Sequence, residues 1–191
     1  LDMDNHHFYR PNWDAPLEAF PTEVPEDITD IIFQISSGLY GARDKEGKFN
    51  PERYQKVMKF CRMTEIKIAQ GAKQTGGKLT GSKVTPAIAY YRNVEPYKDV
   101  FSPNRFPYAN TIEELFDFIG ELQKLSDKPV GVKIVISDLE NIEPYAKEIK
   151  KRIDAGNDAY PDYIALDSGS GGSATAPIEM MERVGLNIRD S

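Results

Sequence analysis

Short apolar runs alternate with segments of helical periodicity along most of the chain. The runs 31–35, 129–136 and 163–166 have the apolar, β-branched or aromatic character of buried β-strands. The segment 65–69 alternates charged and apolar residues, which is also typical of a strand. A helix over about 140–154 separates the last two runs. Three or four strand–helix units are therefore expected.

Capping residues mark the starts of the other predicted helices. At 50–52 the sequence Asn-Pro-Glu offers a cap, a first-turn proline and an acidic residue in that order. Thr-Pro begins a second helix over 85–91. A third helix is expected over about 111–124, where Thr111 and Glu114 have the spacing of a capping box before an apolar stripe.

Strands alternating with helices of these lengths predict an α/β fold with a parallel sheet. A closed barrel of eight such units typically needs about 250 residues, so this chain would hold only part of one. Residues 1–26 lack either periodicity and are expected to be an irregular N-terminal arm, followed by an α/β domain over 27–191. Because the chain begins at Leu1, it is expected to be a piece of a longer protein.

The composition of the chain argues against several classes of function. The 191 residues carry 24 Lys and Arg against 30 Asp and Glu, which argues against a nucleic-acid surface. The apolar runs are far shorter than the ~20 residues that cross a bilayer, so no membrane segment is expected. A single cysteine, Cys61, favours a reducing, cytoplasmic setting and is expected in the core. No metal site is expected, because His6 and His7 have no third ligand nearby.

The loops that follow the predicted strands are the places to look for a site, because parallel α/β folds bind ligands at the carboxyl ends of their strands. The loop after 65–69 contains Gln70, Gly71 and Lys73, and further lysines follow. This combination would suit a dianionic small molecule. The alternative is an ordinary solvated surface loop.

Two further features carry candidate chemistry. Lys133 lies in an otherwise apolar strand, where a charge is costly unless it is paired or used. It would either face a phosphate or an electron-rich ring, or extend to solvent on the outer face. The loop 167–174 places serines between glycines, a composition suited to phosphate, but it has neither the Walker nor the dinucleotide pattern.

These segments together resemble a known family. The matching motifs, in order, are EIKIAQGAK at 65–73, GG at 76–77, KVTPAIA at 83–89, SPNR at 102–105, PVGVK at 129–133, and DS at 167–168 with GG at 171–172. They resemble the synthase domain of glutamate synthase and, more closely, the FMN-binding glutamate-synthase-related proteins. The similarity covers the chain from about Asp27 to its end.

The resemblance implies part of a (β/α)8 TIM-type barrel that binds FMN at its C-terminal face. In the complete protein it implies reductive amination of 2-oxoglutarate to glutamate with hydride from reduced FMN. Gln70, Lys73 and Arg92 would hold the carboxylates of 2-oxoglutarate or a similar dicarboxylate, with Lys67 close by. The residues implied to contact FMN are Lys133, Ser168, Gly171, Gly172 and Ser173.

Two alternatives stay open at this point. A related FMN barrel with different chemistry, such as an isomerase, would share the Lys133 strand and the glycine loop. A diverged or truncated barrel fragment would keep the fold without turnover. The expected partners are the remaining barrel segments or another copy of the chain, although the chain would alternatively fold as a compact half. This chain alone is expected to be inactive.

Overall fold

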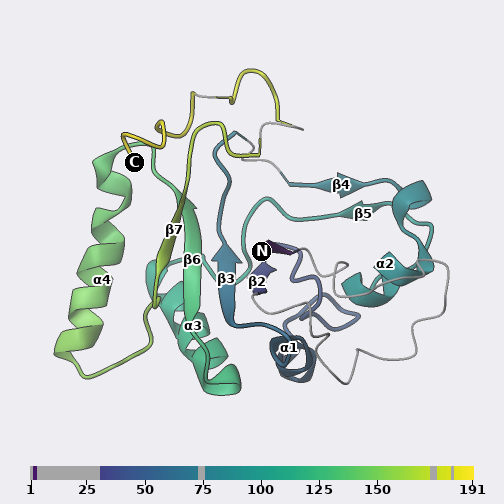
Figure 1. The fold of residues 1–191 in the computed structure, drawn as a ribbon, viewed down its shortest axis with the longest axis horizontal. Helices are drawn as coiled ribbons and strands as arrows, with labels where there is room; N and C mark the ends of the chain where they lie inside the picture. The colour runs from purple at the N-terminus through teal and green to yellow at the C-terminus, as the bar shows by residue number, and fades with distance from the viewer. Residues whose placement is uncertain (1, 4–30, 73–75, 173–175, 182) are drawn as a thin grey trace. The chain divides into compact units, whose positions relative to one another are not determined.

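The computed structural model (Figure 1) describes residues 2–3, 31–72, 76–172, 176–181 and 183–191. The chain folds as two compact units. The first comprises residues 1–65 and 76–103, and the second comprises residues 66–75 and 104–191. The expected irregular arm over residues 1–26 falls outside the described residues, except for Asp2 and Met3. His6 and His7 belong to the part that is not described.

The first unit contains a small parallel arrangement of strands. β1 (Asp2–Met3) pairs in parallel with β2 (Ile32–Ile35), and β3 (Met63–Lys67) is the next neighbour of β2. The strand predicted over 31–35 is confirmed. The backbone N–H of Arg62 donates to the carbonyl of Ile31 at 2.8 Å, which fixes the start of β3 beside β2.

α1 (Pro51–Met58) begins where the capping signal predicted. The side chain of Asn50 accepts the N–H of Arg53 at 2.9 Å, and Pro51 occupies the first turn. Tyr54 is buried and its ring lies 6.2 Å from that of Phe33 in β2. Cys61 is buried as expected. It lies beyond the end of α1, in a turn where the N–H groups of Phe60 and Cys61 donate to the carbonyls of Val57 and Met58.

The rest of the first unit holds a feature that the sequence did not signal. β4 (Lys78–Leu79) and β5 (Val100–Phe101) form an antiparallel pair that the sequence analysis does not predict. A short 3₁₀ helix, η2 (Gly81–Lys83), leads into α2 (Pro86–Arg92). The helix has the predicted Thr85 cap, and Tyr40, Val84, Ala89 and Val100 form a buried apolar cluster.

Parallel strands also form the centre of the second unit. β6 (Val130–Val135) pairs in parallel with β7 (Ile164–Asp167), in a register that sets Val132 opposite Ile164. On the other side of β6 lies the end of β3, where the N–H of Ile68 donates to the carbonyl of Lys133 at 3.0 Å. The expected strand over 65–69 is therefore displaced, since β3 begins and ends two residues earlier.

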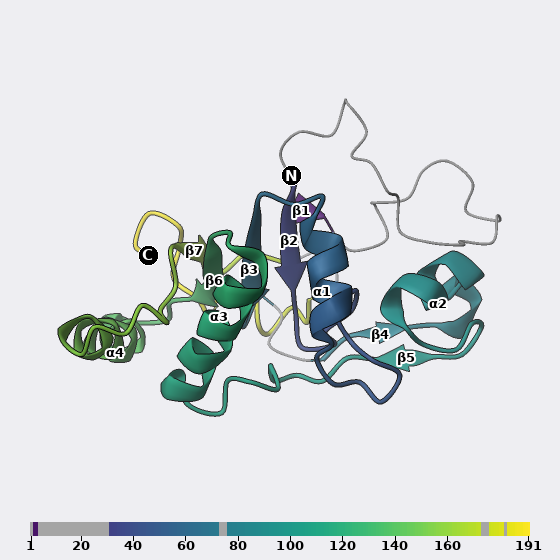
Figure 2. The same ribbon diagram turned by 90° about the horizontal axis from the view of Figure 1, so that it is seen from below.

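Two helices of the second unit accompany this sheet. α3 (Ile112–Ser126) packs on β6, and α4 (Glu143–Asp154), preceded by η3 (Leu139–Asn141), packs beside α3, as Figure 2 also shows. The strands β3, β6 and β7 lie in chain order. This order is consistent with part of a barrel, because a doubly wound sheet would reverse its strand order.

The start of α3 differs in one detail from the expected capping box. Thr111 caps the helix by accepting the N–H of Glu114 at 3.1 Å, as predicted. The carboxylate of Glu114, however, accepts the backbone and side-chain N–H groups of Asn110, each at 2.9 Å, instead of the N–H of Thr111. The reciprocal bond is thus made one residue earlier in the chain.

Arg152 joins α4 to α3. Its Nε donates to Glu148 at 2.9 Å, its Nη2 forms an ion pair with Asp117 at 2.8 Å, and its remaining N–H groups donate to the carbonyls of Glu113 and Ala159. Lys151 adds a second contact to Glu148 at 2.8 Å. Because both cations donate hydrogen bonds to Glu148, the pKa of its carboxyl lies below the ordinary value.

No helix among the described residues is both long and apolar enough to cross a membrane.

Candidate functional site

Two loops of the second unit meet beyond the carboxyl ends of β3 and β7. The backbone N–H of Gly71, after β3, donates to the Asp167 carboxylate at 2.8 Å. The next residue, Ala72, donates its N–H to the carbonyl of Gly171 at 2.8 Å, and Gly171 in turn donates to Ser168 at 2.8 Å. The loop after β3 and the loop after β7 therefore form one hydrogen-bonded surface.

Close backbone approach explains the glycines at this contact. A Cβ on Gly71 would lie 1.6 Å from the carbonyl oxygen of Ser168, which no side chain could tolerate. Gly172 has φ +77°, and a Cβ there would lie 2.7 Å from the amide group of Gln70. These glycines allow the two loops to touch, and the Gln70 side chain lies directly against the backbone of Gly172.

Lys133 and Asp167 form an ion pair at the base of this surface. The Lys133 Nζ lies 3.6 Å from Asp167 Oδ1, and the two side chains are only 21 % and 14 % exposed. The sequence left open whether the Lys133 side chain extends to solvent on the outer face. In the structure it does not, because it is paired with Asp167 and largely buried. The Asp167 carboxylate at the end of β7 contacts both this cation of β6 and the Gly71 N–H, so it joins β6 and β7 to the loop after β3.

The role of Asp167 is the feature that sequence reasoning missed. The available signal was an acidic residue at the end of an apolar strand. Its two partners lie elsewhere in the chain, and one of them is a backbone N–H that leaves no trace in the pattern of residue types.

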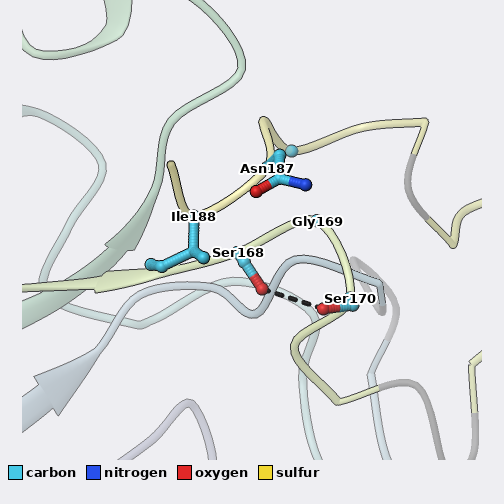
Figure 3. Close-up of a pocket in the computed structure, with 6 residues that line it drawn as sticks. Ser168, Gly169, Ser170, Asn187 and Ile188 are labelled. Atoms are coloured by element: carbon cyan, nitrogen blue, oxygen red, sulfur yellow. Dashed lines mark hydrogen bonds between the residues drawn. The ribbon is translucent and has the colours of Figure 1, made fainter. Parts of the chain in front are cut away.

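A pocket of about 340 Å³ opens beside the loop after β7 (Figure 3). Its lining residues are Ser168, Gly169, Ser170, Gly185, Asn187 and Ile188. The hydroxyls of Ser168 and Ser170 are hydrogen-bonded to each other at 2.9 Å. Leu186 anchors the segment that carries Gly185 and Asn187, because its N–H donates to Ile136 and its carbonyl accepts from Gly169, both at 2.8 Å. The pocket thus presents hydroxyl and amide groups to a ligand.

The structure places the residues implied by the resemblance in two groups. Gln70, Lys67 and the cofactor candidates Lys133, Ser168, Gly171 and Gly172 belong to the second unit. Lys67 is the last residue of β3 and is half-buried. Arg92 belongs to the first unit, where it is the last residue of α2. Lys73 and Ser173 lie outside the described residues.

Within the part of the chain that the structure describes, no three His, Cys, Asp or Glu residues are grouped so that they could hold a metal ion.

These observations define an α/β protein with a polar site at the carboxyl ends of parallel strands, where such folds hold their ligands. Residues 19–189 match the family model described as "Conserved region in glutamate synthase", and the chain belongs to this family. The resemblance found in the sequence is thereby confirmed.

Several curated proteins are similar to the chain. The "Glutamate synthase large subunit-like protein YerD" of Bacillus subtilis is 37 % identical over 161 residues, which are 83 % of this chain and 30 % of that protein. The "Archaeal-type glutamate synthase [NADPH]" of Thermotoga neapolitana is 32 % identical over 173 residues, with 89 % and 30 % covered. The "Ferredoxin-dependent glutamate synthase" of Antithamnion sp. is 34 % identical over 165 residues, with 85 % and 9 % covered. The chain therefore spans less than a third of the length of these relatives.

Proposed function

We propose that this chain is a segment of a (β/α)8 barrel that binds FMN and, in the complete protein, takes part in reductive amination of 2-oxoglutarate to glutamate. Family membership supports the reaction class. The observation that carries the proposal is Lys133, a largely buried cation of β6 that is held by Asp167 at the carboxyl end of β7. A cation in this position can neutralise negative charge on a ligand.

The donor set around Lys133 fits FMN. The Ser168 hydroxyl and the Gly171–Gly172 backbone border the same surface, and Ser173 follows them in sequence. When bound, a flavin supplies hydride-transfer chemistry, while the protein supplies orientation and electrostatics. Lys133 would stabilise negative charge on the reduced ring, and Ser168 and the glycine backbone would orient the cofactor.

The substrate proposed is a dicarboxylate, 2-oxoglutarate in the first instance. Gln70 would donate amide hydrogen bonds to it, Lys73 and Lys67 would contribute point charges, and Arg92 would bind one carboxylate as a planar fork. These residues bind and orient the substrate. None of them needs to change its covalent state.

The proposed organisation assigns residues 27–191 to the barrel and residues 1–26 to an arm that precedes it. The rest of the barrel would come from the remaining length of the protein or from another copy of the chain. This requirement follows from the chain spanning 30 % of relatives such as YerD. The chain alone is accordingly proposed to be inactive.

FMN binding tests the proposal most directly. The purified chain is titrated with FMN while flavin fluorescence is followed, for the wild type, Lys133→Ala and Lys98→Ala. Lys98 is a matched control because it forms an ion pair with Glu95 on the surface of the first unit. Saturable binding at micromolar FMN is expected for the wild type. Lys133→Ala should weaken the affinity about tenfold or more, a loss of about 1.4 kcal/mol or more in binding free energy. Lys98→Ala should leave the affinity unchanged.

Other outcomes favour the alternatives. A folded chain that binds no FMN would contradict the proposal for this segment and favour a non-catalytic barrel fragment. FMN binding that is insensitive to Lys133→Ala would contradict the assigned position of the cofactor. FMN binding by a chain on which 2-oxoglutarate has no effect would favour an FMN barrel with different chemistry.

A further inference from the structure

A second pocket of the second unit is lined by residues outside the candidate site. It has a volume of about 290 Å³ and opens where the carboxyl ends of β3 and β6 face the segment that leads into α4. Its apolar lining residues are Ile68, Ala69, Ile134, Val135 and Val184. It shares no lining residue with the pocket beside the loop after β7. Among the described residues, none that the resemblance assigns to FMN or to the substrate lines it.

Asn141 contributes a polar group whose orientation is fixed. Its side-chain oxygen accepts the N–H of Ser137 at 2.8 Å, the N–H of Asp138 at 3.2 Å and the hydroxyl of Ser137. Because backbone N–H groups only donate, the oxygen of the Asn141 amide must face them. Its NH₂ group has no hydrogen-bond acceptor within the described ranges of the chain, so Asn141 can offer this group to a ligand as a donor.

Ser137 and Tyr145 supply the other two polar groups of the lining. The Ser137 hydroxyl donates its proton to Asn141, which leaves its oxygen as an acceptor. The Tyr145 ring lies 6.2 Å from that of Phe116 in α3, and burial raises the pKa of the Tyr145 phenol, so the hydroxyl keeps its proton at neutral pH. This hydroxyl has no hydrogen-bond partner among the residues that the structure describes.

The chemistry of the lining selects an uncharged ligand. None of the eight lining residues is charged, so an ion that entered the pocket would lose hydration without gaining a counter-charge. A primary carboxamide matches the three polar groups, because its oxygen accepts from Asn141 and Tyr145 while its NH₂ group donates to Ser137. A carboxylate only accepts, so it could not pair with the Ser137 oxygen.

We propose that this pocket binds an uncharged molecule that joins a primary carboxamide to a small apolar body. The carboxamide would lie against Ser137, Asn141 and Tyr145, and the apolar body against Ile134 and Val184. Small-molecule sites combine apolar walls with a few placed polar groups in volumes of roughly 300–1,000 Å³. A pocket of about 290 Å³ therefore suits a single ring. The site requires neither FMN nor the proposed substrate.

Nuclear magnetic resonance titration of the isotope-labelled chain tests this site with two probes of nearly the same shape. Benzamide carries the carboxamide on an apolar ring, and benzoate replaces its NH₂ group with a charged oxygen. Benzamide is expected to shift the amide resonances of Ile134, Val135 and Asn141 saturably, with a Kd of about 1 mM, an ordinary affinity for so small a ligand. Benzoate should bind there about tenfold more weakly or worse, because it loses a hydrogen bond and carries an uncompensated charge.

Three variants separate binding by the polar groups from a structural role. Tyr145→Phe keeps the ring and should weaken benzamide binding about fivefold, the usual effect of one hydrogen bond. Tyr97→Phe is the matched control, because Tyr97 is 67 % exposed in the first unit, and it should leave the affinity unchanged. Asn141→Asp keeps the oxygen that accepts from Ser137 and Asp138 but loses the NH₂ donor. It should retain the thermal midpoint and weaken benzamide binding about tenfold or more.

The inference would be overturned by a folded chain without saturable benzamide binding, or by equal affinities for benzamide and benzoate. Shifts confined to residues outside the pocket, or an affinity that neither Tyr145→Phe nor Asn141→Asp changes, would contradict it equally. A parallel titration contains FMN at saturation, which should leave the Kd of benzamide unchanged. Competition would assign the pocket to the flavin and end the proposal. If benzamide binds as expected while FMN does not bind, the carboxamide site stands and the proposed flavin function fails for this chain.

Discussion

The carboxylate of Asp167 accepts the backbone N–H of Gly71 at 2.8 Å, across 96 residues of sequence. The same carboxylate lies 3.6 Å from the Lys133 ammonium group. One side chain at the end of β7 therefore fixes the loop after β3 and balances the cation of β6. Asp167 is the residue on which the geometry of the candidate site depends most.

Replacement of Asp167 should reveal how much each of its two contacts contributes. Asp167→Ala removes the acceptor and the charge, and should lower the free energy of unfolding by about 1.5–3 kcal/mol, the usual range for a hydrogen bond to a charged group. Asp167→Asn keeps an acceptor for Gly71 and should cost less. Both are measured by urea unfolding. Repeating Asp167→Asn in a Lys133→Met background isolates the ion pair, and an equal cost in both backgrounds would show that the pair contributes nothing.

Gly71→Ala should be strongly destabilising, because the new methyl group would lie 1.6 Å from the Ser168 carbonyl and force the two loops apart. A loss of about 2–3 kcal/mol or more is expected for overpacking of this kind. Gly77→Ala is the matched control, since its nearest neighbour would be the Ser102 hydroxyl at 3.7 Å, an ordinary contact. Similar melting temperatures for the two variants would contradict the loop contact.

Glu148 should make the stability of the chain depend on pH in the acid range. Its pKa is lowered from the ordinary 4.5 by hydrogen bonds from Lys151 and Arg152, so the folded state favours the ionised form. This contribution is complete above pH 4.5 and is lost as the pH falls through the lowered pKa. Glu148→Gln should therefore lose less stability than the wild type on acidification, as followed by chemical unfolding at several pH values.

Glu143 provides the comparison for this effect. The pKa of its carboxyl is also lowered, by Lys147, but the pair lies exposed on the surface of α4. Solvent screens such pairs, so Glu143→Gln should change the acid dependence less than Glu148→Gln does. The reverse order would contradict the structural role given to the Arg152 cluster.

Asn93 should tolerate glycine better than alanine. Its φ of 53° is left-handed, a conformation that costs an alanine about 1 kcal/mol and a glycine almost nothing. Both variants lose the hydrogen bond to Arg43, so the difference between their thermal midpoints reports the backbone conformation alone. Equal midpoints would contradict the left-handed end of α2.

The helix starts could be predicted because their signals are local. Asn50, Thr85 and Thr111 each accept an N–H three residues ahead, so the capping residue and its partner lie in the same short stretch of sequence. The pairing of β4 with β5 could not be predicted in this way. Each strand has two residues, and their partners are about twenty positions apart, so neither has a periodicity to detect.

The same difference between local and long-range signals applies to the candidate site. Lys133 could be identified because a charge within an apolar strand is unusual. Its partner could not, since Asp167 is joined to Lys133 by strand register and to Gly71 by a backbone hydrogen bond.

Leu186 has a consequence for the order in which this part of the protein opens. Its two backbone hydrogen bonds reach Ile136 and Gly169, so they can close only after β6 and β7 are both in place. The free energy of local opening is smaller for such surface loops than for the core strands of a native protein. The amide protons of Leu186 and Gly169 should therefore exchange with solvent before those of the β6–β7 ladder, and the pocket beside them would exchange its contents without unfolding of the sheet.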